Sequence, residues 1–149
     1  MQPTFRWIKA RVMIYATEDR ERVTEMFSEL VGTDEYKEDQ AEGEFGNITV
    51  ILEATLTKQK EFDYLFGKFE PEDLEWILTE MEDRIDENCS FFLRLDKQEA
   101  MSESYVIGRG GDVISLTCKV ASYPAKRELA IDILKEYLKS LNRSPQELP

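Results

Sequence analysis

The feature that most constrains the fold of this chain is a repeated alternation of apolar and polar residues. In residues 112–123 every second position is apolar, at Ile114, Leu116, Cys118 and Val120. The same period of two runs through residues 5–16 and 47–57, and by this parity we expect Phe5 on the open face and Ile48 on the buried face. Such strands bury one face and expose the other, which is typical of antiparallel sheets. We therefore predict a largely antiparallel sheet with one covered and one open face.

Segments with a helical period separate these strands. We expect helices where apolar side chains recur every three or four positions, over residues 18–31, 58–69, 71–87 and 124–141. Gly32 follows the first helix, and Pro71 and Pro124 begin later ones, as helix ends and starts favour. The remaining segments are expected to be strands over 91–96 and 105–107, a loop over 97–104, a hairpin turn over 108–111, and an acidic loop with room for a short strand over 33–46.

These elements predict an α+β fold in the order β-α-β-α-α-β-β-β-α, with the helices packed on one face of a mostly antiparallel sheet. A chain of 149 residues has the size of one domain, so we expect a single domain over 1–149 with residues 142–149 as a flexible tail. The chain contains no run of 18 apolar residues, signal pattern or lipidation motif, so we expect a cytoplasmic protein with no membrane partner.

The absence of histidine limits the chemistry that this chain can perform. It removes Ser/His/Asp and Cys/His catalysis and the common zinc sites, and Cys89 and Cys118 lack the spacing of a metal motif. We expect Cys118 to be a buried, reduced thiol. A carboxylate metal site is a further alternative, but its candidates lie in two loops without a fixed spacing: Asp96, Glu99, Glu103 and Asp112. We therefore predict no cofactor, no metal and no enzymatic activity.

The net charge of −12 is concentrated in the middle of the chain. Residues 17–90 carry 23 acids and seven bases, whereas residues 1–16 carry three bases and no acid. If the aliphatic faces turn toward the helices, the open face gathers aromatic and basic side chains, namely Trp7, Lys9, Arg11, Tyr15, Phe92, Arg94 and Lys119. Rings that stack on bases and cations that neutralise phosphates are what single-stranded RNA binding requires. A solvated sheet face or a homodimer interface is the competing interpretation.

Two cations, Lys126 and Arg127, stand in the expected first turn of the last helix. Positive charge there opposes the helix dipole, but together with the exposed backbone N–H groups it makes an anion site, for which a phosphate is the natural ligand. The alternative, equally open, is that both cations pair with the acidic middle of the chain. Arg109, in the glycine-rich turn, is in a position to contact a further phosphate.

Several motifs, taken together and in this order, resemble a known family. They are YATED from Tyr15, GEFGNITVILEA from Gly43, FFLRLDKQEA from Phe91, GGDVISL from Gly110 and YPAKRE from Tyr123. The chain is similar over nearly its whole length to an archaeal family of small RNA-binding proteins that are predicted exosome subunits. The fold of that family resembles the large-subunit ribosomal protein that binds 5S rRNA.

The resemblance implies RNA binding without catalysis, with functional residues in the matching motifs at Arg94, Asp96, Lys97, Gln98, Gly111, Asp112, Tyr123, Lys126 and Arg127. We therefore expect a non-catalytic RNA-binding protein that acts as an accessory factor in RNA processing or ribosome function. Its expected partners are single-stranded or structured RNA, RNA-processing or ribosomal proteins, and a second copy of itself. The alternative is a protein-interaction module whose acidic helical face, with Glu75, Glu82 and Asp86, docks on a basic partner.

Overall fold

The computed structural model describes residues 3–43, 45–108 and 110–141, so Arg109 and the expected tail 142–149 lie outside the described residues. The strands are β1 (Phe5–Ile14), β2 (Lys37–Glu42), β3 (Ile48–Leu56), β4 (Ser90–Asp96) and β5 (Val113–Val120). The helices are α1 (Arg20–Val31), α2 (Gln59–Phe66), α3 (Pro71–Glu80), α4 (Lys97–Ala100) and α5 (Arg127–Leu141), with a 3₁₀ turn η1 (Met81–Arg84) after α3.

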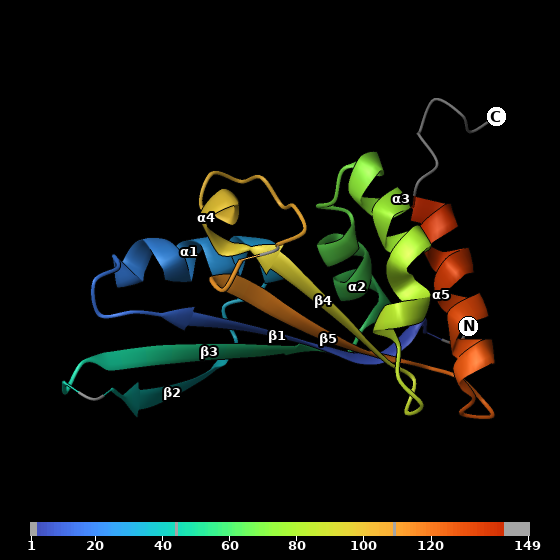
Figure 1. The fold of residues 1–149 in the computed structure, drawn as a ribbon, viewed down its shortest axis with the longest axis horizontal. Coiled ribbons are helices and arrows are strands. Elements are labelled where there is room, and N and C mark those ends of the chain that lie inside the picture. Colours follow the sequence, from blue (N-terminus) through green and yellow to red (C-terminus); the bar gives the residue numbers. More distant parts are fainter. Residues whose placement is uncertain (1–2, 44, 109, 142–149) are drawn as a thin grey trace.

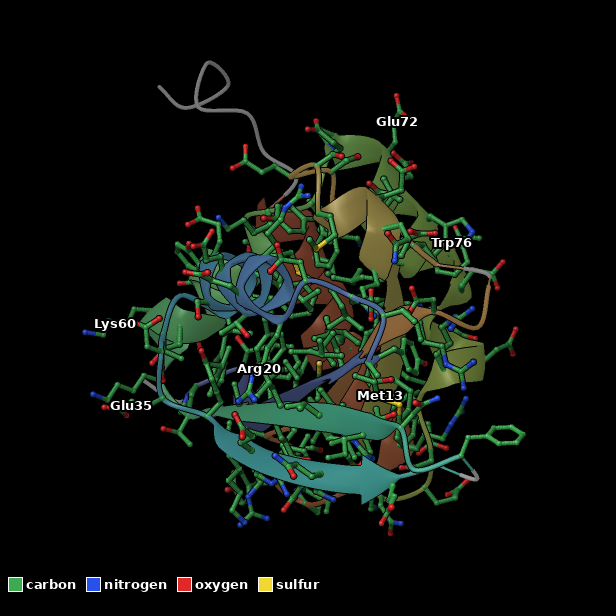
Figure 2. All side chains as sticks on the ribbon, turned by 90° about the vertical axis from the view of Figure 1, so that its left-hand side faces the viewer. Met13, Arg20, Glu35, Lys60, Glu72 and Trp76 are labelled. Carbon is green, nitrogen blue, oxygen red and sulfur yellow. The ribbon has the colours of Figure 1, made fainter. Side chains whose placement is uncertain are left out.

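Within the described residues, five strands form one sheet in the order β2-β3-β1-β5-β4, and every neighbouring pair is antiparallel. The helices lie on one side of this sheet (Figure 1). Figure 2 shows the arrangement from the side of β2 and β3, with the helices above the two strands. The expected α+β fold with one covered sheet face is confirmed.

An aromatic cluster closes the core where β1 meets α2 and α5. The Phe5 ring packs edge-on against Phe62 with centroids 5.3 Å apart, stacks on Phe66 at 5.6 Å, and meets the edge of Tyr137 at 5.6 Å. Buried aromatic rings contribute large apolar areas and favour these edge and offset geometries. The cluster fixes the helices at this end of the sheet and leaves the opposite sheet face open.

Two residues differ from the strand parity that the sequence predicts. Phe5 is fully buried rather than on the open face, because the β1–β5 register shifts between Phe5 and Trp7 and places the extra residue Arg6 in a bulge. Ile48 is about half exposed rather than buried, because it pairs with Glu42 next to the turn of the β2–β3 hairpin, which extends past α1 at the left of Figure 1.

Several boundaries also differ from the prediction. The acidic stretch contains β2, an exposed edge strand whose residues are all polar or small. The expected loop after β4 begins with the short α4, whose first turn is capped because the Asp96 carboxylate accepts a hydrogen bond from the Glu99 amide at 2.9 Å. The expected strand 105–107 is reduced to one bridge between Ile107 and Leu95, and the last helix begins at Arg127.

Candidate nucleic-acid interface

The pairing register places two arginines on either side of one serine on the open face. Arg11 of β1 and Arg94 of β4 both lie directly opposite Ser115 of β5. Residues opposite one another in antiparallel strands share a face and stand about 4.5–5.5 Å apart at Cβ. Both guanidinium groups therefore project from the same side of the sheet, with only the small Ser115 between their strands.

A hollow of about 280 Å³ lies on the face at this row. Its walls include Arg11, Arg94, Tyr15, Gly111 and Ser115. Among the described residues, neither arginine forms an ion pair within 4 Å. A concave site with two unpaired guanidinium groups and two hydroxyls supplies the donors that a phosphate oxygen accepts, and each planar guanidinium can bind it with two parallel hydrogen bonds.

The neighbouring rows of the face add one flat ring each. Lys9 and Phe92 lie opposite Thr117, and the Phe92 ring is 45% exposed. In the next row Trp7 lies opposite Lys119, and the ammonium of Lys9 stands 5.0 Å from the Trp7 ring centroid. These rows alternate cations and rings at the two-residue repeat of a strand, about 6.8 Å.

The positive charge does not cover the whole face. Glu53 lies opposite Arg11 on β3, and on the edge strand β2 Lys37 and Asp39 share this face. Apart from Lys37, which lies among acids, the cations of the open face therefore gather over β1, β5 and β4, namely Lys9, Arg11, Arg94 and Lys119. Lys119 also donates a hydrogen bond to the backbone carbonyl of Asn88.

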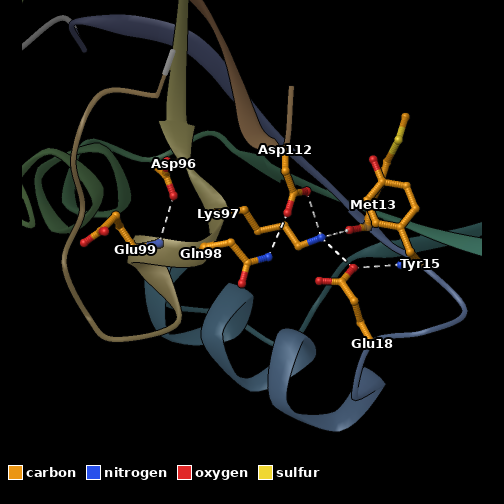
Figure 3. A network of polar contacts seen from close by, with 8 residues as sticks. All are labelled: Met13, Tyr15, Glu18, Asp96, Lys97, Gln98, Glu99 and Asp112. Atoms are coloured by element: carbon orange, nitrogen blue, oxygen red, sulfur yellow. Dashed lines mark hydrogen bonds and ion pairs between the residues drawn. The ribbon is translucent and has the colours of Figure 1, made fainter. Parts of the chain in front are cut away.

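Lys97 occupies a different place from the one that the sequence suggests. Its side chain is fully buried, and its ammonium donates to the Met13 carbonyl at 2.7 Å, to the Glu18 carboxylate at 2.7 Å and to the Asp112 carboxylate at 3.1 Å (Figure 3). The ammonium also stands 4.7 Å from the centroid of the Tyr15 ring. Because every donor has an internal partner, the expected contact of Lys97 with an RNA phosphate does not fit this arrangement.

The Lys97 network instead holds together the end of the sheet that borders the hollow. Its partners come from the end of β1, the turn before α1 and the residue before β5. Tyr15 is fixed further because its backbone N–H donates to Glu18 at 2.9 Å. Gln98 is exposed, and its amide donates to the second oxygen of Asp112 at 2.8 Å. Lys97 therefore positions Tyr15, and through Asp112 also Gly111, beside the two arginines.

The two cations at the start of α5, Lys126 and Arg127, differ in their surroundings. Arg127 is half-buried, and its guanidinium donates to the backbone carbonyl of Ile85 at 3.1 Å and to that of Glu82. This agrees with the alternative that the cation meets the acidic middle of the chain, although backbone oxygens rather than carboxylates accept. Lys126 precedes the helix and is exposed. It lies beyond the end of β5 that is remote from Lys97.

The sequence did not indicate a second hollow, of about 570 Å³, at the outer edge of β4. It is lined by the segment after α3, by β4 and by one glycine, namely Asp83, Arg84, Ile85, Asp86, Phe92, Arg94 and Gly108. The sequence pattern predicts a helix over residues 71–87, and a continuous helix would leave no such hollow. In the structure the α-helix ends at Glu80, and Ile85 pairs with Phe91 at the sheet edge. The polar run Asp86-Glu87-Asn88 is the sequence signal that a turn falls there.

Within the described residues, no group of three or more acidic or cysteine side chains is arranged to hold a metal ion, and no helix is long and apolar enough to cross a membrane. Both cysteines are free and buried, and burial raises the pKa of the Cys118 thiol well above its usual range.

Two of the acids expected to meet a basic partner already have contacts within the protein. Glu82 pairs with Lys135 at 3.1 Å, and the Asp86 carboxylate accepts a hydrogen bond from the Ser90 amide at 3.0 Å.

Comparison with known proteins gives the context for this geometry. Residues 7–120 match a family described as RNA binding. The RNA-binding protein PAB1135 of Pyrococcus abyssi is 30% identical over 141 residues, which is 88% of this chain and 92% of that protein. A DUF54 protein from Methanothermobacter thermautotrophicus has the same fold with a TM-score of 0.77 and 35% identity, covering 94% of this chain and 99% of its own.

A DUF54-family protein from Archaeoglobus fulgidus is similar with a TM-score of 0.74 and 35% identity, over 92% of this chain and 99% of its own. A UPF0201 protein from Methanococcus jannaschii shares the fold at a TM-score of 0.61 and 14% identity, over 92% of this chain and 99% of its own. The fold is therefore shared by more distant archaeal chains than those that match this sequence closely.

Proposed function

Because the chain belongs to the RNA-binding family that it matches over residues 7–120, we propose that it binds RNA through the open face of its sheet, without catalysis. The observation that carries the proposal is the pair Arg11 and Arg94, which flank a hollow on an otherwise acidic protein. A net charge of −12 repels a polyanion at long range, so binding requires a local patch of this kind.

The contacts divide into phosphate and base contacts. Phosphates meet Arg11 and Arg94 in the hollow and Lys9 and Lys119 in the next rows, while bases stack on the rings of the face, Trp7, Tyr15 and Phe92. Gln98 stands at the Tyr15 end of the face, and Lys126 extends the contacts past the end of β5. In this proposal Lys97 and Arg127 are positioning residues, because both are engaged inside the protein.

The cellular role that we propose is an accessory one in RNA processing or ribosome function. It rests on the resemblance of the sequence motifs to a family of predicted exosome subunits, and PAB1135, a relative over 88% of this chain, is named an RNA-binding protein. The competing proposal is that the acidic helical face docks on a basic protein. That alternative expects the partner to remain bound after nuclease treatment and to be lost when Glu75 is replaced by glutamine.

The direct test is reversal of the two central charges. The double variant Arg11→Glu/Arg94→Glu is compared with Lys60→Glu/Lys139→Glu, which changes the net charge equally but alters two exposed lysines on the helical side, in α2 and α5. Fluorescence anisotropy measures binding of a labelled single-stranded RNA and a labelled duplex. We expect the first variant to lose at least ten-fold in affinity and the control to lose two-fold or less.

Two outcomes would contradict the proposal. Equal losses in both variants would mean that only net charge matters, and no loss in either would place the RNA elsewhere.

Light scattering on the same samples tests the alternative of a homodimer through the open face. If the wild type is such a dimer, charge reversal at Arg11 and Arg94 should reduce the measured molecular mass to that of a monomer.

A further inference from the structure

The hollow at the outer edge of β4 has a composition that suits a flat, polar ligand. One wall is the half-exposed Phe92 ring and the buried side chain of Ile85, and another carries the carboxylates of Asp83 and Asp86. Its volume of about 570 Å³ falls within the range of about 300–1,000 Å³ that is typical of small-molecule sites. Part of the site is therefore apolar and aromatic, and the rest can form hydrogen bonds.

Arg94 connects this hollow to the phosphate hollow on the open face, because its side chain lines both. A nucleotide whose phosphate meets Arg94 from the open face has its base within reach of the edge hollow, where Phe92 offers a stacking surface. Gly108 lets the chain pack closely against the end of β4 at this wall, since a Cβ there would stand 2.9 Å from the backbone nitrogen of Asp96. The two hollows are thus arranged as a phosphate site and an adjoining base site.

The presence of carboxylates in this hollow has to be explained, because negative charge next to a phosphate site weakens the binding of a polyanion. A carboxylate only accepts hydrogen bonds, and it can accept two in parallel. Guanine is the base whose Watson–Crick edge offers two adjacent donors, N1–H and the N2 amino group. Adenine and cytosine place an acceptor beside their donor, and uracil places its single donor between two carbonyl groups.

Asp83 is the carboxylate that is available for such a contact. Its side chain is exposed and, among the described residues, forms no ion pair within 4 Å, whereas one oxygen of Asp86 already accepts from the Asn88 amide at 2.9 Å. Arg84 follows Asp83, with its guanidinium 4.8 Å from the Trp76 ring centroid. Arginine donors in the same hollow complement the O6 and N7 acceptors of guanine, the pairing that Arg makes most often with a base.

We propose that the edge hollow of β4 selects an unpaired guanine in single-stranded RNA, which stacks on Phe92, donates to Asp83 from its Watson–Crick edge and accepts from an arginine of the hollow. The inference rests on the proposed RNA binding and adds the preferred base and the requirement for an unpaired strand. A base in a duplex cannot make this contact, because its Watson–Crick edge is occupied.

The test uses labelled eight-nucleotide RNAs of uridine with one central guanine, adenine, cytosine or inosine, and an all-uridine control. We expect the guanine RNA to bind about ten-fold more tightly than the control, within the range that a bidentate base contact gives. Inosine lacks the N2 amino group and should fall between the two. In Asp83→Asn the ratio of guanine to uridine affinity should fall below about two. The matched control Glu72→Gln removes an exposed acid at the far end of α3, visible at the top of Figure 2, and should keep the wild-type ratio.

Equal, salt-sensitive binding of all five RNAs would overturn the base selection and leave the proposed RNA binding in place. A guanine preference that survives Asp83→Asn would also overturn it, since the carboxylate would then not read the base. No binding of any of the five RNAs at low salt would overturn both proposals. Circular dichroism of the exposed-site variant Asp83→Asn confirms that a lost preference is not a loss of folding.

Discussion

Replacement of Lys97 by methionine tests the network that fixes the end of the sheet. Methionine keeps nearly the same length and volume, so the cavity term is small and the change removes mainly the buried ammonium. The three hydrogen bonds of the ammonium, to Met13, Glu18 and Asp112, are lost together. The carbonyl and the two carboxylates then remain at the site without their shared cation.

The magnitude follows from how well the two carboxylates can be solvated. Removing one partner of a buried ion pair costs about 3–5 kcal/mol when the other charge is left without compensation. Here the side chains of Glu18 and Asp112 are 19% and 37% exposed, and each keeps a further hydrogen bond, from the Tyr15 amide and from Gln98. We therefore expect a loss at the lower end, about 3 kcal/mol in the free energy of unfolding. For a chain of this size that corresponds to a fall of about 6–12 °C in Tm.

The assay is thermal and urea denaturation followed by circular dichroism at low protein concentration. The matched control is Lys60→Met, at a lysine that points into solvent from α2 (Figure 2), for which we expect a change below about 0.5 kcal/mol. A Lys97→Met protein within 1 kcal/mol of the wild type would refute the reasoning. It would mean that the free energy that the ammonium gains from its three hydrogen-bond partners is no larger than its cost of desolvation.

Three further predictions concern the scaffold. Arg127→Ala should lower the free energy of unfolding by about 2 kcal/mol in urea titrations, because two backbone carbonyls lose a charged donor. Lys126→Ala, at an exposed residue, should change the same free energy by less than about 0.5 kcal/mol. Similar effects at both positions would contradict the difference in their contacts. Gly32→Ala should cost more than about 1 kcal/mol, because φ is +75° and the new Cβ would stand 2.8 Å from the Tyr64 ring, and a neutral result would show that the ring can move. Cys118 should resist a thiol reagent at pH 8 until the chain unfolds, because burial raises its pKa; rapid labelling of the native protein would contradict this.

The sheet and its open face could be predicted because the signal is local. Alternation within each strand assigns Trp7 and Arg11 of β1, and Lys119 of β5, to the open face. The observed register places them there. The prediction that Phe5 lies on the open face was wrong, because a bulge reverses the alternation of faces at one residue. Alternation by itself does not reveal a bulge. The strand β2 shows no alternation, because it is an exposed edge strand with no apolar face to bury.

The candidate site was less predictable, because its contacts join distant parts of the chain. The partners of Lys97 lie 84, 79 and 15 residues away, so no window of the sequence shows that this lysine is buried. The contacts of Lys97 are internal, so we infer that this motif residue positions its neighbours. Arg127 likewise meets carbonyls 42 and 45 residues away. The edge hollow depends on where α3 ends, and helix ends are among the features that a sequence pattern defines least well.

The measurement that tests the central claim most directly is the salt dependence of binding to a single-stranded RNA, for the wild type and for Arg11→Gln/Arg94→Gln. Four cations of the open face and Lys126 on five phosphates predict a slope of log K against log salt of about −3.5, and the loss of two predicts about −2.1. A slope that becomes shallower by about 1.4 in the variant would identify the two arginines as phosphate contacts. A slope near zero, or one that the variant leaves unchanged, would contradict the account and direct the search for RNA away from this face.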